Sequence, residues 1–325
     1  MHRISVVVPV YRGAATLDGV VKEVLQYAEP FRTADGHRAV VGEVLLVFDH
    51  GPDGSADVIR ALAAGDRRVR AIWLSRNFGQ HAATLAGMAS SGGDWIVTMD
   101  EDGQHDPAAI PDLLDVAMRR GAVLVYADPQ NLPPHGVLRN AASRGAKRLT
   151  DLMTGGRQSR LFQSYRFVLG EIGRSVAAYA GSGVYLDVAL GWVAGDVATC
   201  PVTYRSETRP SGYRLRTLLS HFWRLVLTSG TRGLRFVSLV GVSFLVLGIA
   251  LTGYILVARL TGDVSTPAGW ASTVITVLLT SGIVLFSLGI VAEYVGVAVN
   301  MAMGRPAYLI VGDPASGPLG RRPEQ

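Results

Sequence analysis

The sequence predicts an α/β protein with a mostly parallel sheet, helices on both faces and a membrane-bound C-terminal part. Apolar, β-branched runs alternate with segments of helical spacing through the first 126 residues. Several of these runs end in acidic or polar residues. Two uncharged runs of 23 residues follow, Phe236–Ala258 and Trp270–Ala292. Each would form a helix of roughly 35 Å, which is long enough to cross a bilayer.

The elements follow one another as strand and helix. Continuous apolar runs predict five buried strands: Ile4–Val10, Gly42–Phe48, Val69–Leu74, Trp95–Met99 and Val123–Tyr126. Helical spacing between them predicts four helices: Thr16–Tyr27, Ser55–Ala64, Gln80–Ala89 and Pro107–Arg119. Ser55 suits an N-cap and Pro107 suits a first helical turn. Strands that alternate with helices favour a doubly wound parallel sheet.

The second half of the chain divides differently. A basic helix is expected over Leu138–Met153. Tyr213–Leu227 is amphipathic and precedes an apolar run, which favours a helix in the membrane interface over a core helix of the head. The expected parts are a catalytic domain over 1–212, an interfacial helix over 213–235, a two-helix membrane hairpin over 236–311 and a disordered tail over 312–325.

Composition and charge agree with a protein at a membrane. Of 325 residues 49% are hydrophobic, and mean hydropathy is +0.27. The net charge is +5, and 139–235 holds fifteen Lys and Arg against five Asp and Glu, which favours anionic lipid or phosphate over nucleic acid. Basic residues flank both apolar runs, so the catalytic head is expected on the cytoplasmic side of a multi-pass protein in the plasma (inner) membrane. One cysteine, Cys200, excludes an internal disulfide.

Acidic residues follow the predicted strands at one edge of the sheet. Asp100 and Asp102 come directly after Trp95–Met99, and their oxygens suit Mg²⁺ or Mn²⁺ bridging the phosphates of a nucleotide. Gln104 adds an amide oxygen, whereas Glu101 is expected to point away from the metal. A bare Asp-x-Asp is otherwise often a solvated loop. Asp49 could accept hydrogen bonds from the base or ribose of a nucleotide; the alternative is that it only stabilises a turn.

Arginines provide the candidate phosphate contacts. Arg76 follows the third strand and suits the donor diphosphate. Bidentate contacts to a second phosphate are expected from five others, of which some serve only as solvated or lipid-facing charges: Arg139, Arg144, Arg166, Arg205 and Arg209. The sequence has no Ser-His-Asp pattern, no Cys/His metal spacing, no P-loop and no GxGxxG after a strand, which disfavours hydrolase, zinc-enzyme and dinucleotide-binding functions.

An ordered set of motifs resembles the family-2 glycosyltransferases of the GT-A fold that act on polyprenyl phosphates, such as bactoprenol glucosyltransferases and dolichyl-phosphate mannose synthases. The motifs are Val6–Tyr11, Phe48-Asp49, Ser75–Gly79, Asp100–Pro107, Ser164–Arg166, Ser211–Tyr213, Ser287–Tyr294 and Arg305-Pro306. The chain departs from the family's pattern at Arg12-Gly13, at His50 and at Gly212, where the family has Asn-Glu, a second Asp and Lys.

The resemblance implies a function and a set of site residues. The nucleotide sugar, linked to UDP or GDP, would contact Pro9, Val10, Tyr11, Asp49, Arg76, Asp100 and Glu101. The metal would be held by Asp100, Asp102 and Gln104. The acceptor phosphate would contact Arg139, Arg144, Arg166, Arg205, Arg209 and Ser211. Catalysis is assigned to Asp100, Asp102, Arg166 and Arg205.

The expected reaction is an inverting transfer of a hexose-type sugar to the phosphate of an undecaprenyl-type lipid. The phosphate is already ionised near neutral pH, so no strong general base is required. Two alternatives stay open: a processive or sugar-acceptor membrane glycosyltransferase, and a non-catalytic scaffold of a glycan complex. Only two spans are expected, which disfavours the processive enzyme. Nucleic acid is not an expected partner, and a homo-oligomer formed through the spans is compatible with the resemblance.

Overall fold

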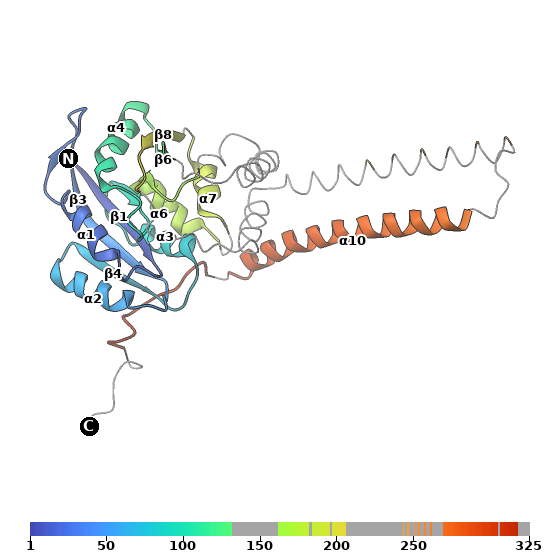
Figure 1. Ribbon diagram of the computed structural model, residues 1–325, viewed down its shortest axis with the longest axis horizontal. Helices are drawn as coiled ribbons and strands as arrows, with labels where there is room; N and C mark the ends of the chain where they lie inside the picture. The colour runs from blue at the N-terminus through green and yellow to red at the C-terminus, as the bar shows by residue number, and fades with distance from the viewer. Residues whose placement is uncertain are drawn as a thin grey trace, which may run out of the picture.

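The computed structural model describes residues 1–131, 162–181, 184–195, 197–205, 269–304 and 306–317, with a few single positions between 243 and 261. The described residues form an α/β head from which one long helix projects (Figure 1). The strands are β1 His2–Val10, β2 Phe31–Arg32, β3 Arg38–Phe48, β4 Val69–Leu74, β5 Trp95–Thr98, β6 Leu124–Pro129, β7 Arg166–Leu169, β8 Val197–Val202 and β9 Ile310–Val311. The helices are α1 Leu17–Leu25, α2 Ser55–Gly65, α3 Gln80–Ala89, α4 Ile110–Arg120, α6 Gly170–Tyr179, α7 Leu186–Val193 and α10 Gly269–Ala302.

The strands form one mixed sheet of order β8-β6-β7-β5-β1-β3-β4-β9, with β2 paired to β3. Parallel pairing joins β5, β1, β3 and β4, which form the centre of the sheet. The strand β7 lies antiparallel between β5 and β6, and β9 pairs antiparallel with β4. The α/β class and the mostly parallel sheet are therefore confirmed, while the antiparallel strands are additions to the predicted doubly wound order.

Alternation along the strands gives the sheet two apolar faces. On β1, Val6 and Val8 pack into one core with α1, α2 and α4. Their neighbour Val7 packs into a second core with α3, α6 and α7. Because successive side chains of a strand point to opposite faces, a fully buried strand reads as a continuous apolar run. Helices thus cover both faces, as the sequence predicts.

The C-terminal part departs from the expected boundaries. Within the described residues one helical stretch, Thr280–Val299 of α10, is apolar and long enough to cross a membrane. The helix α10 runs beyond the expected Ala292 and contains Glu293. The interfacial helix and nearly all of Phe236–Ala258 lie outside the described residues, so the second span stays a prediction.

Residues 306–317 return to the head after α10. Ile310 and Val311 pair with Leu74 and Trp73 of β4, so β9 belongs to the sheet and not to a membrane hairpin that reaches Val311. Asp313 forms an ion pair with Arg60 of α2 (Nε–Oδ2 2.8 Å), so the expected disordered tail cannot begin at 312. The sequence does not reveal this because a two-residue edge strand carries almost no periodic signal.

Candidate functional site

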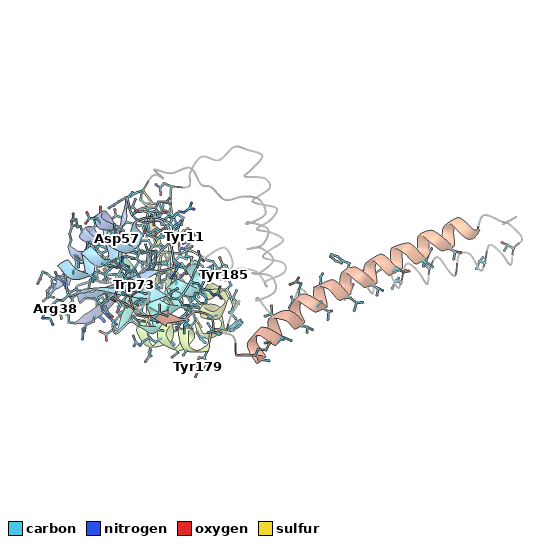
Figure 2. The ribbon with its side chains drawn as sticks, turned by 90° about the horizontal axis from the view of Figure 1, so that it is seen from below. Tyr11, Arg38, Asp57, Trp73, Tyr179 and Tyr185 are labelled. Carbon is cyan, nitrogen blue, oxygen red and sulfur yellow. The ribbon has the colours of Figure 1, made fainter. Side chains whose placement is uncertain are left out.

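Two adjoining cavities open at the carboxyl ends of the parallel strands. One has a volume of about 330 Å³ and is lined by Pro9, Val10, Tyr11, Asp49, Asn77, Gly79, Gln80, Asp100, Glu101 and Asp102. The other has a volume of about 360 Å³ and is lined by Pro9, Gln80, His81, Thr84, Thr98, Met99, Asp100, Phe162, Gln163, Ser164, Arg166, Tyr185 and Asp187. Asp100 lines both cavities and marks their junction. Tyr11 and Tyr185, one from each cavity, lie on the side of the head toward α10 (Figure 2).

Asp100 is held in place by three neighbours. Gln80 at the start of α3 donates from Nε2 to Oδ1 (2.6 Å), and Ser164 donates from Oγ to Oδ2 (2.7 Å). The amide of Asp100 donates to Nδ1 of His105 (3.0 Å). His105 is buried and stacks on Tyr165, and this burial lowers the pKa of its imidazole. The carboxylate of Asp100 is therefore fixed in orientation before any ligand binds.

Asp102 lies across a tight turn from Asp100. Its Oδ1 accepts a hydrogen bond from the backbone amide of Gln104 (3.0 Å). Gly103 has a φ of 78°, a conformation that favours glycine. Asp100 and Asp102 line the same cavity, as the sequence predicts for a metal-binding pair. Their hard oxygens fit Mg²⁺ or Mn²⁺. Gln104 is not among the described residues that line either cavity.

Glu101 anchors the loop that follows β1. Its two carboxylate oxygens accept from the backbone amides of Tyr11 and Arg12 (2.8 Å each). Burial raises the pKa of the Glu101 carboxyl, and these two hydrogen bonds oppose the rise. Glu101 thus lines the 330 Å³ cavity, but both of its carboxylate oxygens accept hydrogen bonds from the loop that carries Tyr11.

Asp49 holds the loop after β4 by accepting hydrogen bonds from its backbone, as Glu101 does for the loop after β1. Its side chain is 3% exposed and accepts from the amides of Phe78 (2.7 Å) and Gly79 (2.8 Å). Burial raises its pKa, against the pull of those hydrogen bonds. Any contact to a base or ribose would use the remaining lone pairs. Arg76 is exposed, lies over the ring of Phe78 at 4.2 Å, and does not line either cavity.

Arg166 lines the 360 Å³ cavity, but its charge is already compensated. The guanidinium pairs with Asp187 (Nη2–Oδ1 3.0 Å), and both side chains are almost fully buried. The Tyr126 hydroxyl also donates to Asp187 (2.8 Å). Nε of Arg166 is buried and has no hydrogen-bond partner within the described part of the chain. The arrangement differs from the freely available phosphate clamp that the sequence suggests.

Arg205 lies apart from both cavity linings. It pairs with Glu23 of α1 (2.7 Å) and with Asp106 (3.0 Å), so it joins β8, α1 and the loop after Asp102. The other predicted acceptor contacts lie outside the described residues: Arg139, Arg144, Arg209 and Ser211.

Sequence reasoning predicted Pro9, Asp100 and Arg166 in the 360 Å³ cavity but missed Gln80 and Asp187, which also line it. Gln80 has a usable signal, because it opens a predicted helix directly after the motif Arg76–Gly79 at the ligand edge of the sheet. Asp187 has none, because it lies in an otherwise apolar helix and is recognised as a site residue only from its contact with Arg166.

The fold and site together define an α/β protein with two cavities lined partly by acidic residues at one edge of its sheet, and with a long apolar helix. A family model described as glycosyl transferase family 2 matches residues 5–173. The chain belongs to this family. The match runs from within β1 to the start of α6 and so includes Asp100, Asp102, Ser164 and Arg166.

Similarity to curated relatives extends over nearly the whole chain. The undecaprenyl-phosphate 4-deoxy-4-formamido-L-arabinose transferase of Pseudomonas aeruginosa (strain LESB58) is 31% identical over 322 residues, covering 94% of this chain and 89% of the relative. The protein of the same name from Salmonella choleraesuis is 28% identical, covering 95% and 93%. The crystal structure of a mycobacterial protein shares the fold, with a TM-score of 0.51 and 21% identity over 71% of this chain and 74% of that chain.

Proposed function

We propose that this protein transfers a sugar from a nucleotide sugar to the phosphate of a polyprenyl lipid, of the undecaprenyl type, at a membrane surface. The observation that carries the proposal is the junction of two cavities at Asp100. A transferase must bring a donor and an acceptor to one point, and here one oriented carboxylate borders both spaces. The names of the relatives, which include undecaprenyl phosphate, support the acceptor class.

We assign the nucleotide sugar to the 330 Å³ cavity. Pro9, Val10, Tyr11 and Asp49 line it, and Asp102 borders it beside Asp100. Mg²⁺ or Mn²⁺ would be held by Asp100 and Asp102, with Gln104 as a further candidate, and would neutralise charge on the departing diphosphate. The donor sugar is a hexose-type sugar or, as in the names of the relatives, a modified pentose; the nucleotide is UDP or GDP.

We assign the acceptor phosphate to the 360 Å³ cavity. A phosphate oxygen attacks C1 of the sugar from the face opposite the diphosphate, an O–C1 bond forms, and the C1–O bond to the diphosphate breaks. The nucleoside diphosphate leaves with the electron pair, so the anomeric centre inverts. The chain's own residues align the partners. Ser164 and Gln80 hold Asp100, and Arg166 lines the cavity with a buried Nε that has no partner within the described chain.

The reaction is tested directly with the full chain in detergent. The protein is incubated with Mg²⁺ or Mn²⁺, undecaprenyl phosphate and a panel of sugars linked to UDP or GDP, including a 4-deoxy-4-formamido-L-arabinose donor. Mass analysis of the lipid identifies the product. We expect a glycosyl phospholipid with the parent chain and none with Asp102→Ala.

A matched control is Asp57→Ala, which removes a carboxylate that is 85% exposed on α2 and should leave transfer unchanged. Full, still metal-dependent transfer by the Asp102→Ala variant would refute the assignment. Transfer to a sugar in place of the lipid phosphate would favour the processive alternative. Metal-dependent nucleotide binding separates any enzyme from a non-catalytic scaffold, which would lack it.

A further inference from the structure

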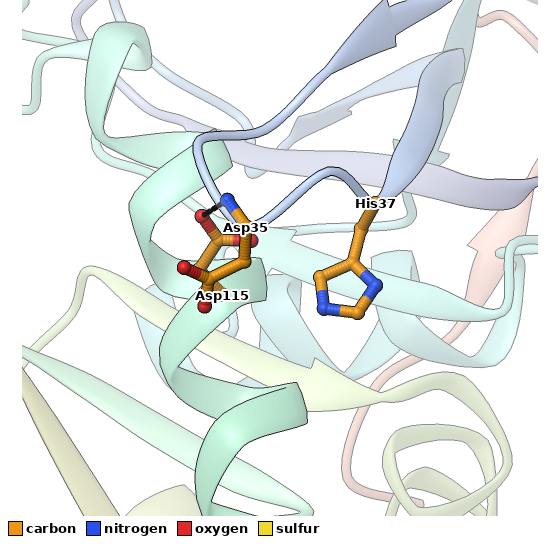
Figure 3. Close-up of side chains that lie close together, drawn as sticks. All are labelled: Asp35, His37 and Asp115. Carbon is orange, nitrogen blue, oxygen red and sulfur yellow. Dashed lines mark hydrogen bonds between the residues drawn. The ribbon is translucent and has the colours of Figure 1, made fainter.

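A second cluster of metal-ligand side chains lies at the opposite edge of the sheet. Asp35 and His37 belong to the hairpin that joins β2 to β3, and Asp115 reaches them from α4 (Figure 3). This hairpin lies at the amino end of β3, whereas both cavities described above lie at the carboxyl ends. One possible ligand atom from each of the three side chains lies within 4.8 Å of the other two.

Asp115 is the unusual member of the cluster. Its side chain is 3% exposed, and Oδ2 accepts from the amide of Asp35 (3.0 Å). The other oxygen, Oδ1, is buried and has no hydrogen-bond partner among the described residues. A buried carboxylate oxygen without a partner is costly to fold, and native structures normally supply a donor or a cation. The arrangement therefore points to a ligand.

Arg119 does not supply that partner. Its guanidinium donates to Oδ2 of Asp35 (2.7 and 3.1 Å) and so compensates the exposed carboxylate. The two side chains of that pair are 61% and 36% exposed, and exposed ion pairs are weak. His37 packs edge to face against His2, with ring centroids 5.8 Å apart.

We propose that Asp35, His37 and Asp115 bind a divalent transition-metal ion, for which Zn²⁺ is the best match. Zn²⁺ accepts imidazole nitrogen together with carboxylate oxygen, whereas Mg²⁺ and Ca²⁺ prefer oxygen alone. Three protein ligands leave a position for water. The bound ion links the β2–β3 hairpin to α4, the helix that follows the Asp100–Asp106 loop. It thereby stabilises the head independently of the metal proposed at Asp100 and Asp102. This inference does not depend on the proposed transfer reaction.

The test must separate this site from the Asp100/Asp102 pair, which also attracts divalent ions. We therefore begin from the full-length Asp102→Ala variant in detergent and titrate it with ZnCl₂ by calorimetry. We expect one zinc ion per chain, a rise in Tm on zinc binding and at least 100-fold weaker binding of Mg²⁺. Adding Asp115→Asn should weaken zinc binding at least 10-fold and abolish the rise in Tm.

A second variant guards against misfolding of the first. His37→Gln changes only a hairpin side chain and should likewise weaken zinc binding at least 10-fold. Asp57→Asn, an exposed carboxylate on α2 remote from the hairpin, should bind zinc as the parent does. The inference is wrong if the Asp102→Ala chain binds no zinc. It is also wrong if the Asp115→Asn and His37→Gln variants bind zinc as tightly as their parent, which would be the result for a site formed by other residues.

Discussion

At the scale of single residues, Gly51 lets two loops beside the 330 Å³ cavity approach each other closely. A Cβ placed on Gly51 would lie 1.6 Å from the carbonyl oxygen of Tyr11. The obstacle is backbone, so no side-chain rotation relieves it. His50, the preceding residue, has a φ of 52°, and Asp49 lines the same cavity. The absence of a side chain at Gly51 therefore sets the shape of the space assigned to the nucleotide.

We predict that Gly51→Ala pushes the loop that carries Tyr11 away from residue 51. Binding of UDP or GDP, whichever is the nucleotide of the donor, should weaken at least 10-fold. Calorimetric titration of the full chain with UDP and with GDP, together with Tm, measures this effect. The control is Gly54→Ala, whose added Cβ would meet only the Cβ of Ala14 at 4.0 Å. Parent-like nucleotide affinity and Tm in the Gly51→Ala variant would contradict the prediction.

The site residues also show where sequence reasoning succeeds and stops. Asp100 and Asp102 line a cavity at the carboxyl ends of the parallel strands, where an acidic pair directly after a buried strand is expected to lie. Their role as metal ligands stays a prediction. The partners of Asp100 could not be inferred. Ser164 lies 64 residues away in sequence, and its hydroxyl meets the carboxylate only because β7 inserts beside β5. Arg166 was predicted as a site residue, but its pairing with Asp187 carries no sequence signal.

At the scale of elements, Glu43 of β3 forms hydrogen bonds with β1, with β4 and with the loop before β5. It lies where the β1–β3 register shifts between Ile4 and Ser5. Its carboxylate accepts from Ser5 Oγ (2.7 Å), from the amide of Gly92 (2.6 Å) and from Arg70. Burial raises the pKa of Glu43, but the three hydrogen bonds outweigh burial and lower the pKa overall. The ionised side chain thus stabilises a junction of β1, β3 and β4.

We predict that Glu43→Gln lowers the free energy of unfolding at pH 7 by about 1–3 kcal/mol, the usual contribution of hydrogen bonds to a charged group. Because the folded pKa lies below the unfolded value near 4.5, this stabilisation is complete above pH 4.5 and is lost as the pH falls through the folded pKa. The difference between variant and parent should therefore shrink in acid.

Urea unfolding of the full chain in detergent, followed by the fluorescence of the buried Trp73 and Trp95, measures this difference at neutral and acidic pH. Glu29→Gln is the control, because the side chain of Glu29 is 87% exposed and its replacement should change stability by less than about 0.5 kcal/mol at either pH. A Glu43→Gln deficit that stays constant down to pH 3 would contradict the pKa assignment.

Elements with strong periodicity were predicted closely. Val69–Leu74 and Gln80–Ala89 have the bounds of β4 and α3, and the other strands and helices predicted up to Tyr126 overlap their observed counterparts. The sequence did not predict β7, β8 or β9. The strand β7 has four residues, and its antiparallel place between β5 and β6 depends on partners distant along the chain. Local patterns identify elements but not the pairing of short strands.

At the scale of the whole molecule, the return of the chain to the head limits its topology. The segment 306–317 pairs with β4 and with Arg60, so it lies on the same side of any membrane as the head. The helix α10 projects away from the head (Figure 1). A chain that leaves and returns to one side must cross an even number of times. If Thr280–Val299 crosses once, another crossing must precede it, and Phe236–Ala258 is the segment whose length and composition suit that crossing.

The last prediction tests this topology. The double variant Val284→Lys/Leu288→Lys changes two side chains of α10 that are 56% and 57% exposed. The two lysines together would disfavour insertion of α10 into the membrane by roughly 5–7 kcal/mol. With a fluorescent protein fused after Gln325 that folds only in the cytoplasm, the parent should fluoresce. The double variant should be dark, because its chain crosses once and leaves the C-terminus outside. A Met118→Lys control on α4 should fluoresce like the parent. A dark parent would place the C-terminus opposite the cytoplasm, and a bright double variant would show that α10 does not span; either result would overturn the two-crossing topology.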